Sequence, residues 1–341
     1  MEENHPQKRK SDHIAINLHE DVRSLLTTGF ERYSLRHVAL PEIDFNTIDT
    51  SLFLFNKKLN CPLFISSMTG GVEGAGLINK NLASAAERLG MAMGVGSQRP
   101  MLDDPSLKAS FEIRKYAPSI LLFANLGAVQ LNYGVTQKEI KTLVEEIGAD
   151  ALILHLNSIQ EVFQPEGEVN FKDLLPKIAS LVNEMKVPVI VKEVGWGISG
   201  KVARILEEIG VAAVDVAGAG GTSWSQVEKF RLNDPIRIRA AEAFRNWGIP
   251  TADCLREIAA QTTTMKIFAS GGLSNGVDVV KAIALGAQLC GFAGKILHAA
   301  TLAEEELEMT LQTLLFELKV AMFGIGAGRL SDIKPDMLSY Q

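Results

Sequence analysis

The stretch "MKIFASGGLSNGVDVVKAIALGAQLCGFAG", residues 265–294, contains the pattern that decides the fold. Short apolar runs stand at its two ends, at 265–272 and 287–294, and each run reaches a glycine-containing turn. Between them, residues 275–287 have apolar positions at helical spacing and finish around a glycine, as helices often do. A strand, a helix and a second strand of this kind predict one unit of a parallel α/β fold.

The same unit recurs along the chain. Helices are predicted at 78–90, 198–210 and 275–287, and 301–323 is predicted as the last barrel helix. The apolar runs are nearly continuous, as expected of strands that are covered on both faces. Eight alternating units favour closure into a (β/α)8 TIM barrel over a doubly wound open sheet, which is the structural alternative. The predicted strands are 61–67, 90–96, 119–127, 150–157, 187–195, 212–221, 265–272 and 287–294.

The barrel is predicted to span residues 61–330 as a single domain. Residues 1–60 fall outside the repeat and are predicted to form an N-terminal arm or cap, while 331–341 form a C-terminal tail. An insertion at 223–250 lengthens the connection between the sixth and seventh strands. No linker or low-complexity tract divides the chain into two domains.

Composition places further bounds on the protein. Of 341 residues, 47% are hydrophobic and 22% are charged, and the net charge of −6 argues against a nucleic-acid partner. Three cysteines without a C-x-x-C pair predict neither a disulfide framework nor a structural zinc site, and fit a reducing compartment. The N-terminus lacks a signal-like apolar region, and no apolar run approaches the roughly 18 residues of a membrane span. We therefore expect a soluble cytoplasmic protein.

Polar and glycine-rich segments follow the predicted strands at one end only. Since catalytic residues of TIM barrels lie at the carboxyl ends of the strands, this asymmetry predicts a functional site there. The segments are "SSMTGG" (66–71), "GSQR" (96–99), "ANLG" (124–127), "HLNSIQE" (155–161), "VKEVG" (191–195), "GAGGTSW" (218–224), "ASGG" (269–272) and "FAGK" (292–295).

Alternation along two strands indicates which side chains enter the barrel. In the fourth strand, Leu152, Leu154 and Leu156 share one face, and Ile153, His155 and Asn157 share the other. We expect the leucines to face the helices and the second set to face the barrel interior. In the fifth strand, Lys192 shares a face with Ile190, and an inward lysine is costly unless it meets an anion or an electron-rich ligand. The alternatives are a hydrogen-bonded core histidine and a lysine that reaches water.

The glycine-rich turns after the seventh and eighth strands predict a phosphate site. Glycine allows the backbone to approach a phosphate, and a helix N-terminus supplies N–H donors. Many barrels share this site, so it predicts a phosphate-bearing cofactor without identifying it. The "GAGG" at 218–221 extends this rim but does not meet the spacing of a dinucleotide-binding fingerprint.

Taken together, these motifs resemble the FMN-dependent type 2 isopentenyl diphosphate isomerases. The resemblance adds "RKSDH" (9–13) and "VKEVGWGIS" (191–199) to the strand ends above and runs from the arm to the last barrel helix. It implies FMN at the barrel mouth with a diphosphate substrate over its ring, Mg²⁺ on the diphosphate, and NADPH as reductant. It also implies a homo-oligomer, either a tetramer or an octamer. One departure is Lys295, where some relatives carry arginine.

The resemblance assigns roles by motif position. Glu161 is the expected Mg²⁺ ligand, because one carboxylate with phosphate oxygens and water suffices for this cation. Trp224 and Glu228 are the expected catalytic side chains, with a cation-stabilising aromatic face and a proton-relaying carboxylate. The expected substrate contacts are Arg9, Lys10, Ser97, Gln98, Arg99, His155, Asn157 and Gln160. The expected FMN contacts are Ser67, Met68, Thr69, Ser97, Asn125, Lys192, Thr222, Gly271, Gly272, Leu273, Ala293 and Gly294.

The implied reaction is a 1,3-proton shift between isopentenyl and dimethylallyl diphosphate, with reduced FMN acting as acid and base. A rival hypothesis is an FMN-dependent 2-hydroxyacid oxidase, whose barrel also uses glycine-rich loops and a fifth-strand lysine. That enzyme needs a late histidine, and residues 265–287 contain none. A flavin- or phosphate-binding module without activity is the non-enzymatic alternative.

Overall fold

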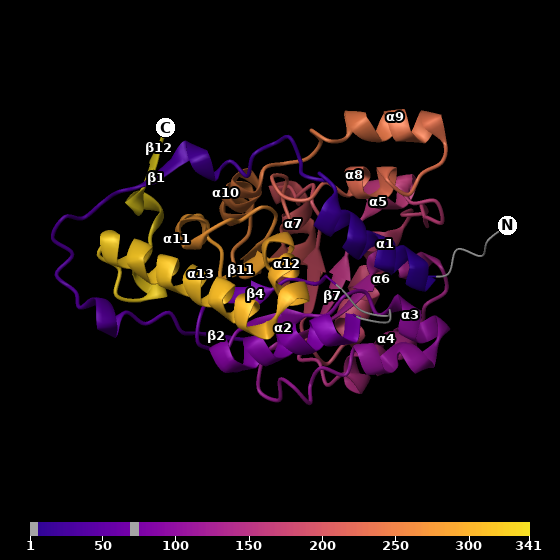
Figure 1. Cartoon of the computed structure of the whole chain (residues 1–341), viewed down its shortest axis with the longest axis horizontal. Coiled ribbons are helices and arrows are strands. Elements are labelled where there is room, and N and C mark those ends of the chain that lie inside the picture. Colours follow the sequence, from indigo (N-terminus) through magenta and orange to yellow (C-terminus); the bar gives the residue numbers. More distant parts are fainter. Residues whose placement is uncertain (1–5, 69–74) are drawn as a thin grey trace.

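The computed structural model describes residues 6–68 and 75–341 and shows a closed barrel of eight parallel strands (Figure 1). Each of the eight predicted strands is confirmed, although the regular part is shorter than the apolar run. Closure is completed by pairing of the eighth strand with the first, where Cys290 lies opposite Leu63, so the open-sheet alternative is excluded. The barrel strands are β4 (Leu63–Ile65), β5 (Ala92–Gly94), β6 (Leu122–Gly127), β7 (Ala151–His155), β8 (Val189–Lys192), β9 (Ala213–Asp215), β10 (Lys266–Ala269) and β11 (Leu289–Phe292).

Helices surround the barrel, and three of them confirm the predicted helices at 78–90, 198–210 and 275–287. The predicted helix 301–323 corresponds to α13 from residue 304 onward, whereas residues 301 and 302 belong to a separate shorter helix, α12. The two are divided at Ala303, whose backbone is extended (φ −158°, ψ 158°). The helices are α1 (Pro6–His19), α2 (Ala75–Leu89), α3 (Arg99–Asp103), α4 (Gln137–Glu146), α5 (Ser158–Phe163), α6 (Leu174–Glu184), α7 (Gly200–Glu208), α8 (Trp224–Lys229), α9 (Pro235–Ala243), α10 (Thr251–Gln261), α11 (Gly276–Ala284), α12 (Gly294–Leu302) and α13 (Glu304–Gly324).

The barrel interior is apolar at the amino ends of the strands. Phe64, Phe123 and Phe268 pack on one another there, and the rings of Phe123 and Phe268 stack with centroids 6.1 Å apart. The hairpin of β2 (Leu52–Leu54) and β3 (Lys57–Leu59) closes this end by adding Leu54 and Leu59 to the cluster. This end of the barrel is therefore filled by packed apolar side chains.

The segment before the barrel contacts it at several places. Helix α1 packs against α8 and α12 near the carboxyl ends of the strands, as Figure 1 shows. Further along, β1 (Tyr33–Leu35) pairs antiparallel with β12 (Leu338–Tyr340), so the arm and the tail meet. The insertion between the sixth and seventh strands contains α8 and α9. Short 3-10 helices occur at η1 (Phe30–Arg32), η2 (Phe45–Thr47), η3 (Pro105–Ser110), η4 (Ala128–Asn132), η5 (Leu330–Asp332) and η6 (Pro335–Met337).

None of the helices within 6–68 and 75–341 combines the length and the apolar character needed to cross a membrane.

Candidate active site

A cavity of about 1120 Å³ opens at the carboxyl ends of the strands, beneath α1. It is lined by nearly all the predicted site residues that the structure describes, although lining a cavity does not by itself test their roles. Thr69, predicted to contact FMN, lies outside the described residues. The predicted residues that line the cavity are Arg9, Lys10, Ser67, Met68, Ser97, Arg99, Asn125, His155, Asn157, Gln160, Glu161, Lys192, Thr222, Trp224, Gly271, Gly272, Leu273, Ala293 and Gly294.

A buried ion pair forms the floor of this cavity. Lys192 Nζ lies 3.0 Å from Asp215 Oδ2, and the two side chains are 9% and 1% exposed. Ser270 Oγ donates to Asp215 Oδ1 at 2.6 Å, and Lys192 Nζ also donates to the carbonyl of Glu193. The ladder aligns the pair, because Lys192 and Asp215 are register partners on β8 and β9. The inward direction predicted for Lys192 is confirmed, and its anion is Asp215.

His155 occupies the neighbouring register position to Lys192, and its inward direction is also confirmed. The Asn125 amide group donates to the carbonyl of Val95, which leaves Asn125 Oδ1 to accept from His155 Nδ1 at 2.9 Å. Burial and the nearby Lys192 charge lower the pKa of His155 to about 3, so the ring is neutral. In this tautomer Nε2 is an acceptor, and an incoming anion would favour protonation of the ring.

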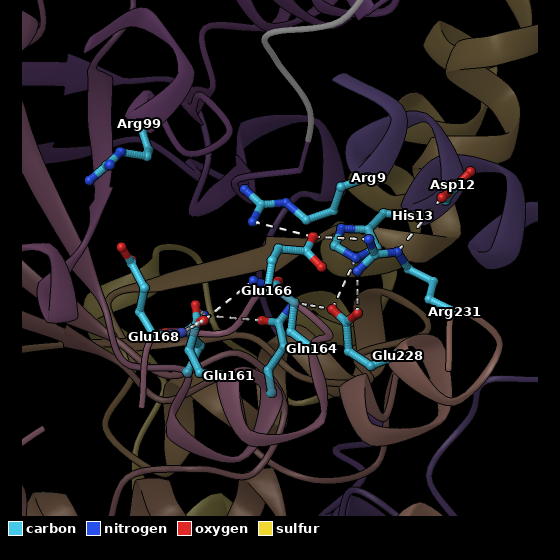
Figure 2. Close-up of polar contacts among 12 residues, drawn as sticks. Arg9, Asp12, His13, Arg99, Glu161, Gln164, Glu166, Glu168, Glu228 and Arg231 are labelled. Carbon is cyan, nitrogen blue, oxygen red and sulfur yellow. Dashed lines mark hydrogen bonds and ion pairs between the residues drawn. The ribbon is translucent and has the colours of Figure 1, made fainter. Parts of the chain in front are cut away.

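The polar residues after β7 form a connected group at the start of α5. Asn157 Nδ2 donates to Glu161 Oε1 at 2.7 Å. The backbone N–H of Glu168 donates to Glu161 Oε2 at 2.7 Å, and Figure 2 shows Glu161 and Glu168 side by side. Gln164 Nε2 also donates to Oε2, at 3.3 Å. Burial raises the pKa of Glu161, and the hydrogen bonds from Glu168 and Asn157 act in the opposite direction. The group presents hard oxygen atoms to the cavity, which are ligands suited to Mg²⁺.

The described residues contain no cluster of three or more histidine, cysteine or acidic side chains that could hold a metal ion. Glu161 would therefore be a single protein carboxylate whose cation is completed by ligand oxygens and water. That arrangement is the usual one for Mg²⁺ beside phosphates.

A second polar cluster lies on the α1 side of the cavity. His13 Nε2 is 2.9 Å from Glu228 Oε1, which also accepts from Gln160 Nε2 at 2.9 Å. The rings of His13 and Trp224 meet edge to face with centroids 5.2 Å apart. Burial alone would raise the pKa of Glu228, but His13 and Arg231 lower it to about 2. Glu228 is fully buried and does not line the cavity, so it is a carboxylate one hydrogen bond behind His13 and Gln160.

The side chain of Gln98, a predicted substrate contact, makes its hydrogen bonds within the protein wall behind the cavity. Its side chain is fully buried and does not line the cavity. Gln98 Nε2 donates to the carbonyl of Leu143 on α4 at 3.1 Å, and its Oε1 accepts from the backbone N–H of Asn125 at 3.0 Å. Gln98 therefore connects α4 to β6 and holds Asn125 in place. It takes this position at the point where the chain enters α3.

The glycine-rich rim has the shape expected of a phosphate cradle. A Cβ atom added at Gly294 would meet only Thr222 Oγ1 at 3.9 Å, so the backbone at the start of α12 faces open space. Gly272 has φ +85°, and an added Cβ would lie 2.5 Å from the Gly220 backbone, which requires glycine for loop packing. Ser67 Oγ is buried without a hydrogen-bond partner among the described residues. A short helix after the eighth strand and an unpaired hydroxyl both fit FMN.

Four residues that the sequence argument did not assign also shape the site. Asp215 and His13 have just been described, and Arg231 contacts Glu228. Glu193 Oε2 accepts from four successive backbone N–H groups, those of 194–197, at 2.5 to 3.1 Å, and thereby fixes the loop after β8. Period-two alternation on β9 could have identified Asp215, which shares a face with Ala213. The contacts of His13, Arg231 and Glu193 leave no comparable sequence signal.

The fold and this site place the chain among FMN-dependent barrel enzymes. Residues 135–340 match the model of the FMN-dependent dehydrogenase family. The fold is similar to that of the flavin-binding domain of baker's yeast flavocytochrome b2, with a TM-score of 0.69, 17% identity and coverage of 96% of this chain and 82% of that one. A chimeric (S)-mandelate dehydrogenase mutant gives a TM-score of 0.68 at 15% identity, covering 98% of both chains. At such identities these likenesses show the fold alone.

Curated relatives identify the family more narrowly. The chain is 49% identical over 327 residues to an isopentenyl-diphosphate delta-isomerase of Rickettsia bellii, covering 96% of both proteins. It is 50% identical over 329 residues to a protein of the same name from a Nostoc species, covering 96% of this chain and 94% of the relative. The chain belongs to the FMN-dependent, type 2 family of isopentenyl-diphosphate delta-isomerases. It is an enzyme, and the predicted resemblance is confirmed.

Proposed function

We propose that the enzyme interconverts isopentenyl diphosphate and dimethylallyl diphosphate by a 1,3-proton shift, with reduced FMN, Mg²⁺ and NADPH as reductant. The observation that carries this proposal is a single cavity that is lined both by basic side chains and by a carboxylate suited to Mg²⁺. The basic side chains of Arg9, Lys10 and Arg99 line the same space as Glu161. A diphosphate between them would meet cations directly and the carboxylate through Mg²⁺.

Reduced FMN would supply the proton donor and acceptor of the reaction. The chain's own part is to hold the cofactor, and Lys192 with its Asp215 partner would lie at one edge of the ring. The start of α12 would hold the phosphate through its backbone N–H groups. The residues proposed to contact FMN are Ser67, Met68, Thr69, Ser97, Asn125, Lys192, Thr222, Gly271, Gly272, Leu273, Ala293 and Gly294.

The substrate diphosphate would bind between the arm and α5. Lys10 Nζ donates to the carbonyl of Ser97 at 2.8 Å, and burial followed by the Arg9 charge lowers the pKa of Lys10 to about 7. An anion beside Lys10 would restore its charge, so substrate binding and lysine protonation would favour each other. Arg9, Lys10, Ser97, Arg99, His155, Asn157 and Gln160 are the proposed contacts, and Glu161 is the proposed Mg²⁺ ligand.

The alkene end of the substrate would lie toward Trp224. Its indole face could stabilise positive charge that develops on carbon. Because the pKa of Glu228 is lowered to about 2, Glu228 would stay ionised and act as a hydrogen-bond acceptor that holds His13 and Gln160. His13, which lines the cavity, would donate a hydrogen bond to Glu228 on this side.

The oligomeric state and the compartment are part of the same proposal. The family resemblance suggests a tetramer or octamer. Apolar side chains on α13 that could be covered by another copy of the chain include Met309 and Phe316, which are 62% and 60% exposed. A cytoplasmic location is supported by three buried cysteines that are all free thiols. Light scattering of the purified enzyme would measure the assembly.

An anaerobic assay tests the function. The enzyme is mixed with FMN, Mg²⁺ and NADPH, and isopentenyl diphosphate is followed by NMR in D₂O. We expect dimethylallyl diphosphate and deuterium in the allylic positions once the flavin is reduced, and no turnover while it is oxidised. Reduced flavin without product or deuterium uptake would refute the proposal. Reduction of the flavin by a 2-hydroxy acid would instead favour the oxidase.

A further inference from the structure

A single buried arginine connects the two polar clusters above the cavity. Arg231 follows α8, and its side chain is only 4% exposed. Its Nη1 lies 2.8 Å from Glu228 Oε2, its Nη2 lies 2.9 Å from Glu166 Oε1, and its Nε lies 3.7 Å from Asp12 Oδ2 (Figure 2). The three carboxylates come from α8, from the segment after α5 and from α1. Arg231 itself does not line the cavity, so any effect on the reaction must pass through these partners.

One path leads from Arg231 through Glu228 to His13 and Gln160, which line the cavity. Glu228 Oε2 accepts from Arg231, which leaves Oε1 for His13 and Gln160. A fully buried carboxylate with no cation beside it would favour its protonated form. Protonated Glu228 would lose acceptor capacity, and His13 and Gln160 would then lose the partner that orients them. Arg231 therefore keeps this part of the cavity in one arrangement.

The other path runs through Glu166 to the diphosphate side. Glu166 lines the cavity, and its Oε1 also lies 3.7 Å from Arg9 Nη1. Glu166 is thus shared by two guanidinium groups, one buried and one on the cavity wall. Arg9, Asp12 and His13 stand at helical spacing on one face of α1, so all three can face the side on which Arg231 lies. Other contacts also hold α1, including that of Lys10 with Ser97.

We propose that Arg231 is a positioning residue that orients His13 and Gln160 through Glu228 and Arg9 through Glu166. This inference rests on the proposed function, because it assigns the two paths to the alkene and diphosphate ends of the substrate. A lysine could not replace it, since one ammonium group cannot reproduce the planar fork that contacts two carboxylates at once.

The experiment uses the FMN-loaded enzyme with Mg²⁺ and measures two quantities for each variant. Calorimetry gives the Kd of inorganic pyrophosphate, which probes the diphosphate side without turnover, and the anaerobic assay gives kcat. Arg231→Met should raise the pyrophosphate Kd and lower kcat, each by about 10- to 100-fold, as loss of a supporting contact typically does. Glu166→Gln should raise the Kd by a similar factor and lower kcat less than Arg231→Met does, because the described contacts of Glu166 include Arg9 and not Glu228. The matched control is Arg204→Met, which removes an exposed helical ion pair with Glu208 and should change neither quantity.

A double-mutant cycle separates the paths. In the Glu166→Gln background, Arg231→Met should raise the Kd no further, because both changes act on Arg9 by the same route, while kcat should still fall. Additive effects on the Kd would overturn the Glu166 path. A pH profile tests the Glu228 path. Among the described residues, the titratable or charged groups that contact Glu228 are His13 from α1 and Arg231, so removing Arg231 should move the acid limb of kcat to higher pH. An unmoved limb would overturn that path.

If Arg231→Met does not bind FMN, Arg231→Lys decides the matter. This variant keeps the charge and loses the fork, so it should raise the pyrophosphate Kd by about tenfold or more. A wild-type Kd and kcat in Arg231→Lys would overturn the inference. Pyrophosphate binding also keeps the two proposals distinct. The variants could change the pyrophosphate Kd as expected while the wild-type enzyme fails to isomerise isopentenyl diphosphate. In that case the proposed function fails and the role of Arg231 in anion binding stands.

Discussion

The two ends of the barrel are built by the same strands and differ completely in character. At the closed end, Ile153, Ile190 and Ala213 belong to a buried apolar cluster capped by the β2–β3 hairpin. Two residues further along each strand, the inward positions are His155, Lys192 and Asp215. About 6.6 Å of strand separates the two layers. The difference shows that the inward polar side chains of β7, β8 and β9 share one layer, in which the register partners Lys192 and Asp215 form an ion pair.

The largest effect on stability is expected from Lys192→Met. Asp215 would remain fully buried and would keep only its hydrogen bond from Ser270 Oγ among the described contacts, and an unpaired buried charge costs about 3 to 5 kcal/mol. Urea unfolding of the FMN-free protein measures this loss. Lys192→Met combined with Asp215→Asn should recover most of it, because a neutral pair has no unpaired charge. A double variant as unstable as the single one would show that the polar layer depends on something other than this pair.

A smaller loss is expected from Leu59→Ala at the closed end. Leu59 is 1% exposed in the apolar cluster, and removing such a side chain costs about 2 to 4 kcal/mol. The affinity for FMN should stay unchanged, because the cavity lies at the other end. Phe53→Ala is the matched control in the same hairpin, since Phe53 is 77% exposed and should change stability by less than about 0.5 kcal/mol. Weakened flavin binding in Leu59→Ala would contradict the separation of the two ends.

Glu161→Gln should act mainly on ligand binding. We expect Mg²⁺-dependent pyrophosphate binding to weaken by about tenfold, or about 1.4 kcal/mol, with FMN absorbance retained. Because the folded-state pKa of Glu161 is raised, its ionised form destabilises the folded protein, and that cost disappears as pH falls through the raised pKa. The stability of the wild type relative to Glu161→Gln should therefore increase on acidification. Loss of bound FMN, or the opposite pH trend, would show that Glu161 has another role.

The smallest effect on stability is expected from Gly294→Ala. The added methyl group would point into open space at the start of α12, so stability should change by less than about 0.5 kcal/mol, while FMN should bind more weakly. Gly272→Ala is the comparison, because its positive φ and its contact with Gly220 should make it clearly destabilising. Fluorescence quenching of free FMN measures the affinity. Unchanged affinity in Gly294→Ala would mean that the phosphate lies elsewhere.

Much of the site could be predicted because strands alternate with a period of two. That rule placed His155 and Lys192 inside the barrel from the sequence alone, and it applied equally to Asp215. It could not place Gln98, which lies beyond the end of β5 and turns toward α4. Nor could it identify Arg231, whose three carboxylate partners are 3, 65 and 219 positions away in the chain. Contacts between distant loops leave no periodic trace.

By itself, the sequence determined the order of strands and helices, the polar character of one end of the barrel, and the family. These properties follow from local patterns, since each strand or helix shows its period within about ten residues. Only the tertiary structure decided which charges pair. The Lys192–Asp215 contact depends on the register of β8 with β9. The contacts of Arg231 depend on where α1 and the segment after α5 come to rest on the barrel. Such pairings depend on the packing of elements that are distant in the sequence. A buried charge needs a partner, and the fold determines which opposite charge lies within hydrogen-bonding distance.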